Sequence, residues 1–437
     1  MAYKAPKGTQ DLLPSQARAW NAFTAKAADD FSLYGYEPIE TPAFEKSELF
    51  LRGCGETCDA ATKEIFSVFS VGAVSCLKEG TALKSDQKLA LRPEGTASVV
   101  RAIAEHNLVP QGAAPVKLFY AGPMYRCERP QKGRLREFHQ VGVECLGATD
   151  ACADAEMIIM CMRFFEALGI KRESMTLLIN SMGDDKCRPA YTQAVKDYMV
   201  EHQDGLCEEC RRRIETNPLR AFDCKNPACF EVMEGAPRFS DHLCDECNER
   251  HVQVKGYLEA AGISYVEDPR LVRGFDYYTG TVFEVQVTEG LGSQSAIGGG
   301  GRYDGLMGEV GGTDLPGLGF AVGFERIMLA LEAQGISLDP GAPKSVYVAC
   351  VDDSARPQAF GILQQLRDAG IAALSDTQGR SLKSQFKVAG KMDAALAVVI
   401  GPDELAAGQV KVRDFSSHEE TLVAVADVAA TVAKMLG

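Results

Sequence analysis

Residues 118–147 read LFYAGPMYRCERPQKGRLREFHQVGVECLG and are the most informative part of the sequence. Two runs with the composition of β-strands, residues 118–127 and 137–146, flank residues 130–133, whose proline and glycine are typical of a turn. The stretch therefore predicts a β-hairpin.

Side chains alternate across a strand, so the second run of the hairpin has two different faces. One face is largely apolar and carries His139, Val141, Val143 and Cys145, and the other carries Phe138, Gln140, Gly142 and Glu144. Four arginines lie near the second face in the sequence: Arg126, Arg129, Arg134 and Arg136. An amide and a carboxylate beside several cations predict a site for a polyanion and a small polar ligand, although an ordinary hairpin with a solvated face has the same pattern.

The composition is that of a globular protein with two or three domains. The chain has 437 residues, of which 46% are hydrophobic and 24% are charged. Its first residues lack the apolar core of a signal peptide and no run of about 18 apolar residues occurs, so we expect a cytoplasmic protein without membrane spans. The fifteen cysteines are then expected to be reduced thiols or metal ligands. The net charge of −14 restricts any RNA contact to a local basic groove.

Hydrophobic periodicity predicts the other elements of the first part of the chain. We expect helices at residues 20–34 and 149–170, an extended segment at 36–42, a strand leading into a helix at 89–106, strands at 175–181, 270–276 and 281–288, and a final strand and helix at 317–333. A glycine run at residues 298–301 is weak evidence by itself, because such runs often form loops.

Two regions differ from this pattern. Residues 183–256 are rich in cysteine and charge and are interpreted as an inserted subdomain. After Pro340, strands and helices alternate as in a separate α/β domain. Strands are expected at 345–351, 371–375, 394–400 and 409–414, and helices at 354–369, 380–391 and 419–435.

A series of ordered motifs makes the chain similar to bacterial histidyl-tRNA synthetases, a family of class II aminoacyl-tRNA synthetases. Besides the hairpin they are KGTQDLLP (7–14), YGYEPIETPAFEKSELF (34–50), LRPEGTA (91–97), LVRGFDYYTGTVFEV (271–285), GGRYDGL (300–306) and GLGFAVGFERIMLAL (317–331). LVRGFDYYTG is close to the histidine-pocket signature of the family and separates the chain from other class II synthetases.

The resemblance implies an α+β catalytic domain with an antiparallel sheet, formed by residues 1–182 and 257–335. It further implies an inserted cysteine-rich subdomain at 183–256 and a C-terminal α/β anticodon-binding-type domain at 344–437. The implied enzyme uses ATP with Mg²⁺ to convert L-histidine to histidyl-adenylate, then transfers histidine to the 3′-terminal ribose of tRNA(His). Residues 34–50 would form the interface of a homodimer.

Residue by residue, the resemblance implies an ATP site of cations and one aromatic ring. Arg126 would bind the α-phosphate, Arg273 would bridge this phosphate and the histidine carboxylate as the catalytic cation, and Arg326 would hold the γ-phosphate and cover the adenine. Phe138 would stack on the other face of the base, and Glu128 belongs to the same site. Arginine suits this chemistry because it stays charged and binds phosphate and carboxylate bidentately.

Recognition of neutral imidazole requires one acceptor and one donor. By resemblance, Glu144 would face one ring nitrogen and Tyr278 the other, with Tyr277 beside it. Glu94, Thr96 and Gln140 would hold the α-ammonium group. The structural alternative for the two tyrosines is that they are ordinary core aromatics.

The inserted region leaves several alternatives open. Cys207 with Cys210 and Cys244 with Cys247 have the spacing of a four-thiolate zinc site, with Cys224 and Cys229 as alternate ligands, but free reduced thiols are the favoured alternative. The acceptor arm of tRNA would contact the hairpin turn at Arg129, Gln131 and Arg134. The arginines beside the cysteines, Arg211, Arg212, Arg213 and Arg220, would suit such a contact or a solvated helix face.

A protein of another class is the main functional alternative. A catalytically silent paralogue, such as the histidine-sensing regulatory subunit of ATP phosphoribosyltransferase, would keep the fold without the chemistry. Such a paralogue need not retain the ATP-binding arginines, RGFDYYTG or a terminal anticodon-binding domain, and this chain has all three.

Overall fold

The computed structural model describes residues 3–55, 58–109, 115–291 and 295–437. The chain divides into two compact units, Met1–Pro340 and Gly341–Gly437. Within the described residues, no helix combines the length and the apolar character needed to cross a membrane.

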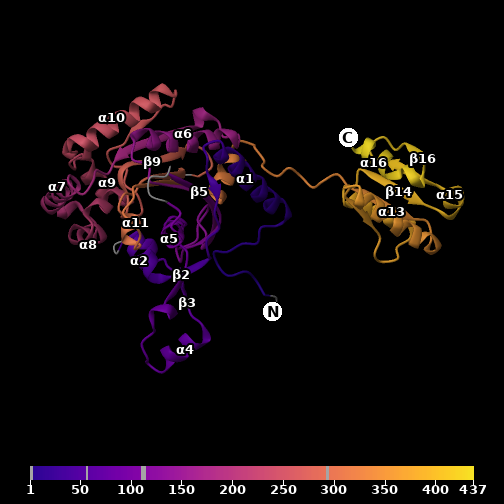
Figure 1. Ribbon diagram of the computed structural model, residues 1–437, viewed down its shortest axis with the longest axis horizontal. Helices are drawn as coiled ribbons and strands as arrows, with labels where there is room; N and C mark the ends of the chain where they lie inside the picture. Colours follow the sequence, from indigo (N-terminus) through magenta and orange to yellow (C-terminus); the bar gives the residue numbers. More distant parts are fainter. Residues whose placement is uncertain (1–2, 56–57, 110–114, 292–294) are drawn as a thin grey trace. The chain divides into compact units, whose positions relative to one another are not determined.

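An eight-stranded sheet forms the centre of the first unit (Figure 1). The predicted hairpin supplies β5 (Val116–Tyr125) and β6 (Glu137–Leu146), which pair in antiparallel register. The order is β1-β5-β6-β11-β10-β9-β7-β8, and among the described residues of this sheet only the edge strands β1 and β8 pair in parallel. The other strands are β1 (Glu37–Pro38), β7 (Met175–Ser181), β8 (Val266–Glu267), β9 (Thr279–Val287), β10 (Ala296–Arg302) and β11 (Gly317–Gly323).

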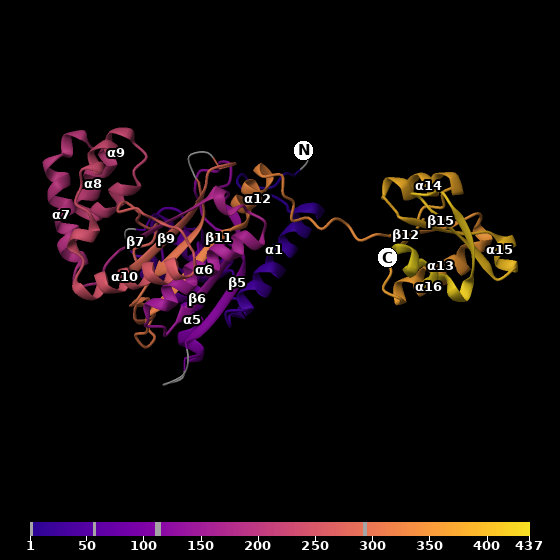
Figure 2. The same ribbon diagram turned by 90° about the horizontal axis from the view of Figure 1, so that it is seen from above.

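Helices cover the apolar face of this sheet. These helices are α1 (Pro14–Ser32), α6 (Ala151–Ala167) and α10 (Asp245–Ala260), with α12 (Phe324–Ala333) following β11. In Figure 1, α6 lies above the sheet, and Figure 2, seen from that side, shows it in front of the strands. Phe23 and Phe31 of α1 and Phe164 of α6 pack with Val141 and Val143 of β6 in one core. The opposite face of β6, with Phe138, Gln140 and Glu144, is thereby left for the site.

A small three-stranded sheet, ordered β2-β4-β3, lies beside the central sheet. Its strands are β2 (Phe44–Lys46), β3 (Ser67–Val68) and β4 (Leu89–Leu91), and the neighbouring helices are α2 (Ser47–Cys54), α3 (Asp59–Thr62), α4 (Val71–Lys78) and α5 (Thr96–His106). Figure 1 shows β3 and α4 extending away from the rest of the first unit. Phe44, Phe69, Val71 and Leu77 expose apolar side chains on this part.

Residues between β7 and β8 form a helical region, whose buried side chains belong to one cluster with side chains of α5, β5 and β6. It contains α7 (Arg188–Glu201), α8 (Glu208–Thr216), the 3₁₀ helix η4 (Pro218–Asp223), α9 (Pro227–Glu234) and α10. In Figure 2, α7, α8 and α9 lie together at one end of the first unit.

The second unit has a five-stranded mixed sheet with order β13-β12-β14-β15-β16. Its strands are β12 (Val346–Cys350), β13 (Ala373–Ser375), β14 (Leu396–Ile400), β15 (Gln409–Asp414) and β16 (Glu420–Ala424), and its helices are α13 (Arg356–Asp368), α14 (Leu382–Lys391), α15 (Pro402–Ala406) and α16 (Val428–Leu436). Side chains from both sheet and helices build a separate core around Val348, Leu363 and Val398.

Two sequence predictions of secondary structure are wrong. Residues 270–276 form an irregular loop rather than a strand, and the loop is fixed by contacts with the helical region. The helix expected at 419–435 begins only at Val428, because residues 420–424 pair with β15 as strand β16. Alanine and leucine in this segment favour a helix, but the pairing with β15 overrides that preference.

Candidate active site

Glu144 lies at the centre of a buried polar pocket. Its side chain projects from β6, and the residue is 1% exposed. Thr96 Oγ1 donates a hydrogen bond to Glu144 Oε1 at 2.7 Å, and the Tyr303 hydroxyl donates to Oε2. Burial raises the pKa of Glu144 to about 8, although the bonds from Tyr303 and Thr96 act in the opposite direction. The carboxyl group in this pocket therefore holds its proton to a higher pH than an exposed glutamate does.

Glu94 connects this pocket to the first turn of α5. Its carboxylate accepts hydrogen bonds from the backbone N–H groups of Thr96, at 2.6 Å, and Ala97, at 2.8 Å. Free N–H groups at a helix N-terminus favour a carboxylate in this position. Burial nevertheless leaves the pKa of Glu94 above its ordinary value. Glu94 thus fixes Thr96, which in turn holds Glu144.

The irregular loop that contains residues 271–278 brings a cation and two phenols to the same pocket. Tyr277 and Tyr278 are buried, and the Tyr277 ring lies 5.6 Å from the Tyr303 ring. The Arg273 guanidinium lies 5.8 Å from the centre of the Tyr278 ring and donates from Nη1 to Glu284 Oε2 at 2.9 Å. Burial would lower the pKa of Arg273, but Tyr278 and Glu284 outweigh it, so this cation stays charged.

A cavity of about 230 Å³ lies beside the pocket around Glu144 and is lined by four arginines, Arg126, Arg134, Arg273 and Arg326. The Arg126 guanidinium lies 5.1 Å from the centre of the Phe138 ring, and its Nε donates to Pro93 O at 2.9 Å. Burial and the charge of Arg134 lower the pKa of Arg326. Guanidinium groups that line one cavity repel one another, and a bound polyanion offsets this electrostatic repulsion.

The cavity also has buried polar atoms suited to a ligand. Within the described residues, Gln140 Oε1 and Arg273 Nε are buried without a hydrogen-bond partner. Buried polar groups are almost always paired in folded proteins, so unpaired ones facing a cavity indicate a ligand. Glycine makes this approach possible, since a β-carbon at Gly299 would lie 2.9 Å from Arg273 Nη1. Within the glycine run at 298–301 of β10, a side chain at residue 299 would collide with Arg273, so glycine is needed there.

The other predicted site residues lie at the hairpin turn. Glu128 and Arg134 form an ion pair at 3.2 Å and both line the arginine cavity. Arg129 and Gln131 are exposed at the turn and do not line this cavity. The structure thus brings together the residues predicted to bind ATP and histidine. Arg129 and Gln131 lie outside this group.

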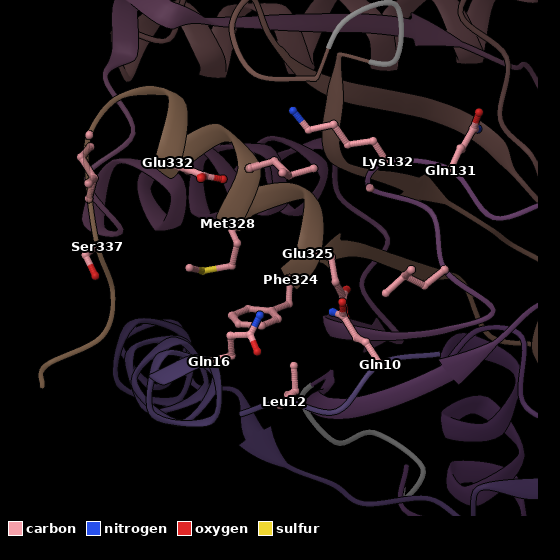
Figure 3. Close-up of a pocket in the computed structure, with 15 residues that line it drawn as sticks. Gln10, Leu12, Gln16, Gln131, Lys132, Phe324, Glu325, Met328, Glu332 and Ser337 are labelled. Carbon is pink, nitrogen blue, oxygen red and sulfur yellow. The ribbon is translucent and has the colours of Figure 1, made fainter. Parts of the chain in front are cut away.

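A larger, mainly apolar cavity of about 660 Å³ lies on the other side of Glu325 (Figure 3). Leu12 and Gln16 approach it from the N-terminal segment, and Phe324 and Met328 from α12. Glu325 lines both cavities, and its carboxylate accepts from the backbone N–H of His139 at 3.0 Å. This larger cavity lacks the cluster of arginines and does not contain the predicted site residues of the polar face.

The sequence did not identify Tyr303 as a site residue. GGRYDGL was recognised as a motif, but only the strand pairing reveals that its tyrosine reaches Glu144. The preceding Arg302 has a structural role, since it is 2% exposed and pairs with the buried Asp154 at 2.6 Å. Tyr303 directly follows the last residue of β10, where the register with β9 is irregular, so strand alternation alone does not reveal its direction.

The seven cysteines between β7 and β8 lie in two separate groups. One contains Cys207, Cys210, Cys224 and Cys229, and the other contains Cys244 and Cys247 with Asp184 and Cys187. The predicted combination of Cys207 and Cys210 with Cys244 and Cys247 in a single site is therefore wrong. Sequence spacing identified the pairs, but only the three-dimensional fold determines which pairs meet.

Comparison with known proteins gives consistent matches along both units. The family model described as histidyl-tRNA synthetase matches residues 8–184 and 230–327, and the model of an anticodon binding domain matches residues 345–435. The histidine–tRNA ligase of Desulforamulus reducens is 45% identical over 97% of both chains. That of Halothermothrix orenii is 43% identical over the full length of both.

Solved structures agree with these matches. The apo histidyl-tRNA synthetase of S. aureus has a TM-score of 0.80 at 33% identity, covering 98% of this chain and 99% of that one. A protein from Bacillus halodurans described as an ATP phosphoribosyltransferase regulatory subunit/histidyl-tRNA synthetase has a TM-score of 0.62 at 21% identity, covering 92% of this chain and 98% of that one. The second likeness shows the fold alone.

Proposed function

The chain belongs to the histidyl-tRNA synthetase family, and from this premise we propose roles for the residues of its two adjoining pockets. The protein is an enzyme that activates L-histidine with ATP and transfers it to tRNA(His). The observation that carries the assignment of the site is the convergence of Arg126, Arg273 and Arg326 on one cavity beside the buried Glu144.

The arginines have distinct parts in adenylate formation. The histidine carboxylate attacks the α-phosphorus of ATP, a new P–O bond forms, and pyrophosphate leaves with the electrons of the broken P–O bond. Arg126 holds the α-phosphate against the Phe138 face, and Arg273 neutralises the charge that develops between phosphate and carboxylate. Arg326, at the start of α12, holds the far end of the triphosphate and covers the adenine.

Magnesium accompanies ATP in this reaction. The carboxylates of Glu128 and Glu284 line the same cavity as the arginines, and oxygen donors are the ligands that Mg²⁺ prefers. These residues therefore fit a magnesium ion that partly neutralises the triphosphate. Structural zinc is a separate proposal, because it concerns the folding of the cysteine-containing helical region rather than the chemistry of ATP.

Histidine recognition rests on the polar pocket around Glu144. Its oxygens already accept hydrogen bonds from Thr96 and Tyr303, and each retains a lone pair for the imidazole N–H. The Tyr278 hydroxyl donates a hydrogen bond to the other nitrogen of the imidazole ring. Gln140 Oε1, buried without a described partner, accepts from the α-ammonium group together with Glu94. An amino acid without these groups leaves buried polar atoms unpaired, which costs about 1–3 kcal/mol for each.

The regulatory alternative has less support. A histidine sensor would use the pocket around Glu144 but would not need four arginines in a neighbouring cavity. It would also not need a C-terminal unit that matches an anticodon binding domain. The likeness to the Bacillus halodurans protein does not decide between the functions, because it is limited to the fold.

The remaining parts of the proposal concern architecture. We assign catalysis to residues 1–182 and 257–335, an inserted subdomain to 183–256, and anticodon binding to 344–437. The exposed apolar side chains near residues 34–50 support a homodimer, since large apolar patches mark interfaces. Arg129 and Gln131, exposed at the hairpin turn, are proposed to contact the tRNA acceptor arm with Arg134. The reaction takes place in the cytoplasm, where translation consumes charged tRNA.

ATP–pyrophosphate exchange with each of the twenty amino acids, followed by charging of tRNA(His), tests this function. We expect exchange with histidine alone and transfer of histidine to the tRNA. Tight histidine binding without exchange would contradict the proposed enzyme and favour the sensor.

A further inference from the structure

We propose that the helical region between β7 and β8 contains two structural zinc sites of different composition. The first has four cysteine ligands, Cys207, Cys210, Cys224 and Cys229, and the second has three cysteines and one aspartate, Cys187, Cys244, Cys247 and Asp184. In each group, one ligand atom from every residue lies within 4.8 Å of all the others. This proposal does not rest on the reaction assigned to the enzyme.

The geometry of the first group agrees with a tetrahedral thiolate site. Two sulfurs on one zinc ion lie about 3.8 Å apart, because each Zn–S bond is about 2.3 Å long. Cys207 Sγ and Cys224 Sγ lie 3.8 Å apart. Backbone N–H groups also point at the sulfurs, from Cys207 to Cys229 Sγ at 3.1 Å and from Cys210 to Cys207 Sγ at 3.4 Å. Such outer contacts orient metal ligands and stabilise their negative charge.

The second group joins the helical region to the end of β7. Asp184 and Cys187 follow β7, whereas Cys244 and Cys247 lie at the start of α10. Asp184 Oδ2 lies 3.8 Å from Cys244 Sγ, and a tetrahedral zinc ion separates oxygen and sulfur ligands by about 3.6 Å. Asp184 Oδ1 is held by the backbone N–H groups of Lys186, at 3.0 Å, and Cys187, at 3.1 Å. The backbone contacts therefore fix the carboxylate beside Cys244, whose Sγ lies 3.9 Å from Oδ1 and 3.8 Å from Oδ2.

Disulfides do not explain these clusters. A disulfide requires sulfurs about 2.05 Å apart, and the cysteines of both groups are free. Four thiols in one group, and three thiols with a carboxylate in the other, are difficult to explain as ordinary core residues. Metal binding gives each group one common partner.

The position of the two sites suggests what they stabilise. Between Cys210 and Cys224, Asn217 Nδ2 donates to Asp276 Oδ1 at 3.2 Å, and Arg220 donates to the backbone carbonyls of Arg273 and Gly274. Directly after Cys187, Arg188 donates to the backbone carbonyl of Tyr278. Both zinc sites therefore lie next to the residues that hold the loop with Arg273 and Tyr278. The metals act as positioning elements for this loop and are not part of the chemistry.

Metal analysis of the full-length protein, purified without chelators, tests the proposal directly. Inductively coupled plasma mass spectrometry is expected to find about two zinc ions per chain. The double variants Cys224→Ser/Cys229→Ser and Cys244→Ser/Cys247→Ser should each retain about one. Cys152→Ser is the matched control, because Cys152 is exposed and belongs to neither group. It should retain the full metal content.

Cobalt substitution distinguishes the two sites and does not depend on loss of metal in a variant. Zinc is replaced by Co²⁺ in the two double variants, each of which keeps one intact site. The thiolate-to-cobalt absorption per cobalt ion should then be in a ratio of about 4:3 for the first site over the second. Asp184→Cys should keep two metals and raise the absorption of the second site.

Less than about one zinc per two chains in the wild-type protein would overturn the proposal. Equal thiolate absorption per cobalt in the two double variants would overturn the assignment of Asp184. ATP–pyrophosphate exchange is measured on the same preparations. A failure of the zinc proposal can then be distinguished from a failure of the proposed reaction.

Discussion

Gly319 lies directly opposite Glu144 in the central sheet, and a β-carbon at residue 319 would overlap the Glu144 carboxylate. Because Gly319 of β11 has no side chain, the Glu144 carboxyl group of β6 can occupy the space beside it. Glycine is needed here for close approach rather than for an unusual backbone angle.

Gly319→Ala should therefore displace Glu144 and raise the KM for histidine at least tenfold, with a smaller change in the KM for ATP. Overpacking of this kind costs about 1–3 kcal/mol of stability. Steady-state exchange kinetics and thermal unfolding measure both effects. Gly256→Ala in α10, where a β-carbon meets no atom within 4 Å, is the matched control and should leave both KM values unchanged. An unaltered histidine KM in Gly319→Ala would contradict the assignment of Glu144.

The raised pKa of Glu144 predicts a pH-dependent stability. A carboxyl group whose pKa rises from 4.5 to about 8 on folding holds its proton more tightly in the folded state. Its contribution to stability is full below pH 4.5, decreases as the pH rises, and is lost once the pH passes about 8. Glu144→Gln removes this titration, so the stability of the wild type relative to the variant should fall between pH 5 and 8. Urea unfolding at several pH values measures the difference, and parallel curves would refute the prediction.

Arg273→Ala should reduce the rate of ATP–pyrophosphate exchange by about 10²–10³, because a fixed donor to the transition state is lost. Histidine affinity should change much less. Arg270→Ala is the control on the same loop, since Arg270 contacts Asp268 and the Phe230 ring outside the arginine cavity. Exchange in Arg273→Ala within tenfold of the wild type would exclude a catalytic role.

Light scattering at micromolar concentration should give about twice the chain mass of 47.2 kDa, as for a homodimer. Phe44→Asp, which places a charge on the exposed apolar part of β2, should shift the equilibrium toward monomer. Val252→Asp introduces the same charge at an exposed position of α10 and should not. A wild-type protein of single-chain mass would rule out the proposed interface.

Truncation after Pro340 should preserve ATP–pyrophosphate exchange within an order of magnitude, because the first unit is compact without the second. Charging of tRNA should fall strongly through a higher KM for tRNA, since anticodon bases are read by stacking and edge contacts. Exchange, charging and melting temperature are measured on one preparation. Equal losses of exchange and charging would argue against a role in anticodon recognition.

Much of the fold followed from local sequence patterns. The hairpin at residues 118–147 and its two different faces depend on neighbouring residues, and both are present. The alternating elements predicted after Pro340 are also present, apart from the strand at residues 420–424. Gln140 and Glu144 were correctly placed on one side of β6, because strand alternation is a local property.

The errors concern contacts between distant parts of the chain. The loop at 270–276 depends on Arg220 and Asn217 of the helical region, and β16 depends on its pairing with β15. Tyr303 reaches Glu144 only because β10 and β6 both flank β11. No periodicity in the sequence contains this information.

The strand order also governs how the enzyme is made. Leu146 at the end of β6 pairs with Gly317 at the start of β11, so a nascent chain exposes one edge of β6 while the whole helical region is being synthesised. Long-range pairing of this kind is slow, and an unpaired strand edge invites aggregation. The central sheet therefore cannot close until β11 has been synthesised, and the edge of β6 stays unpaired during that interval.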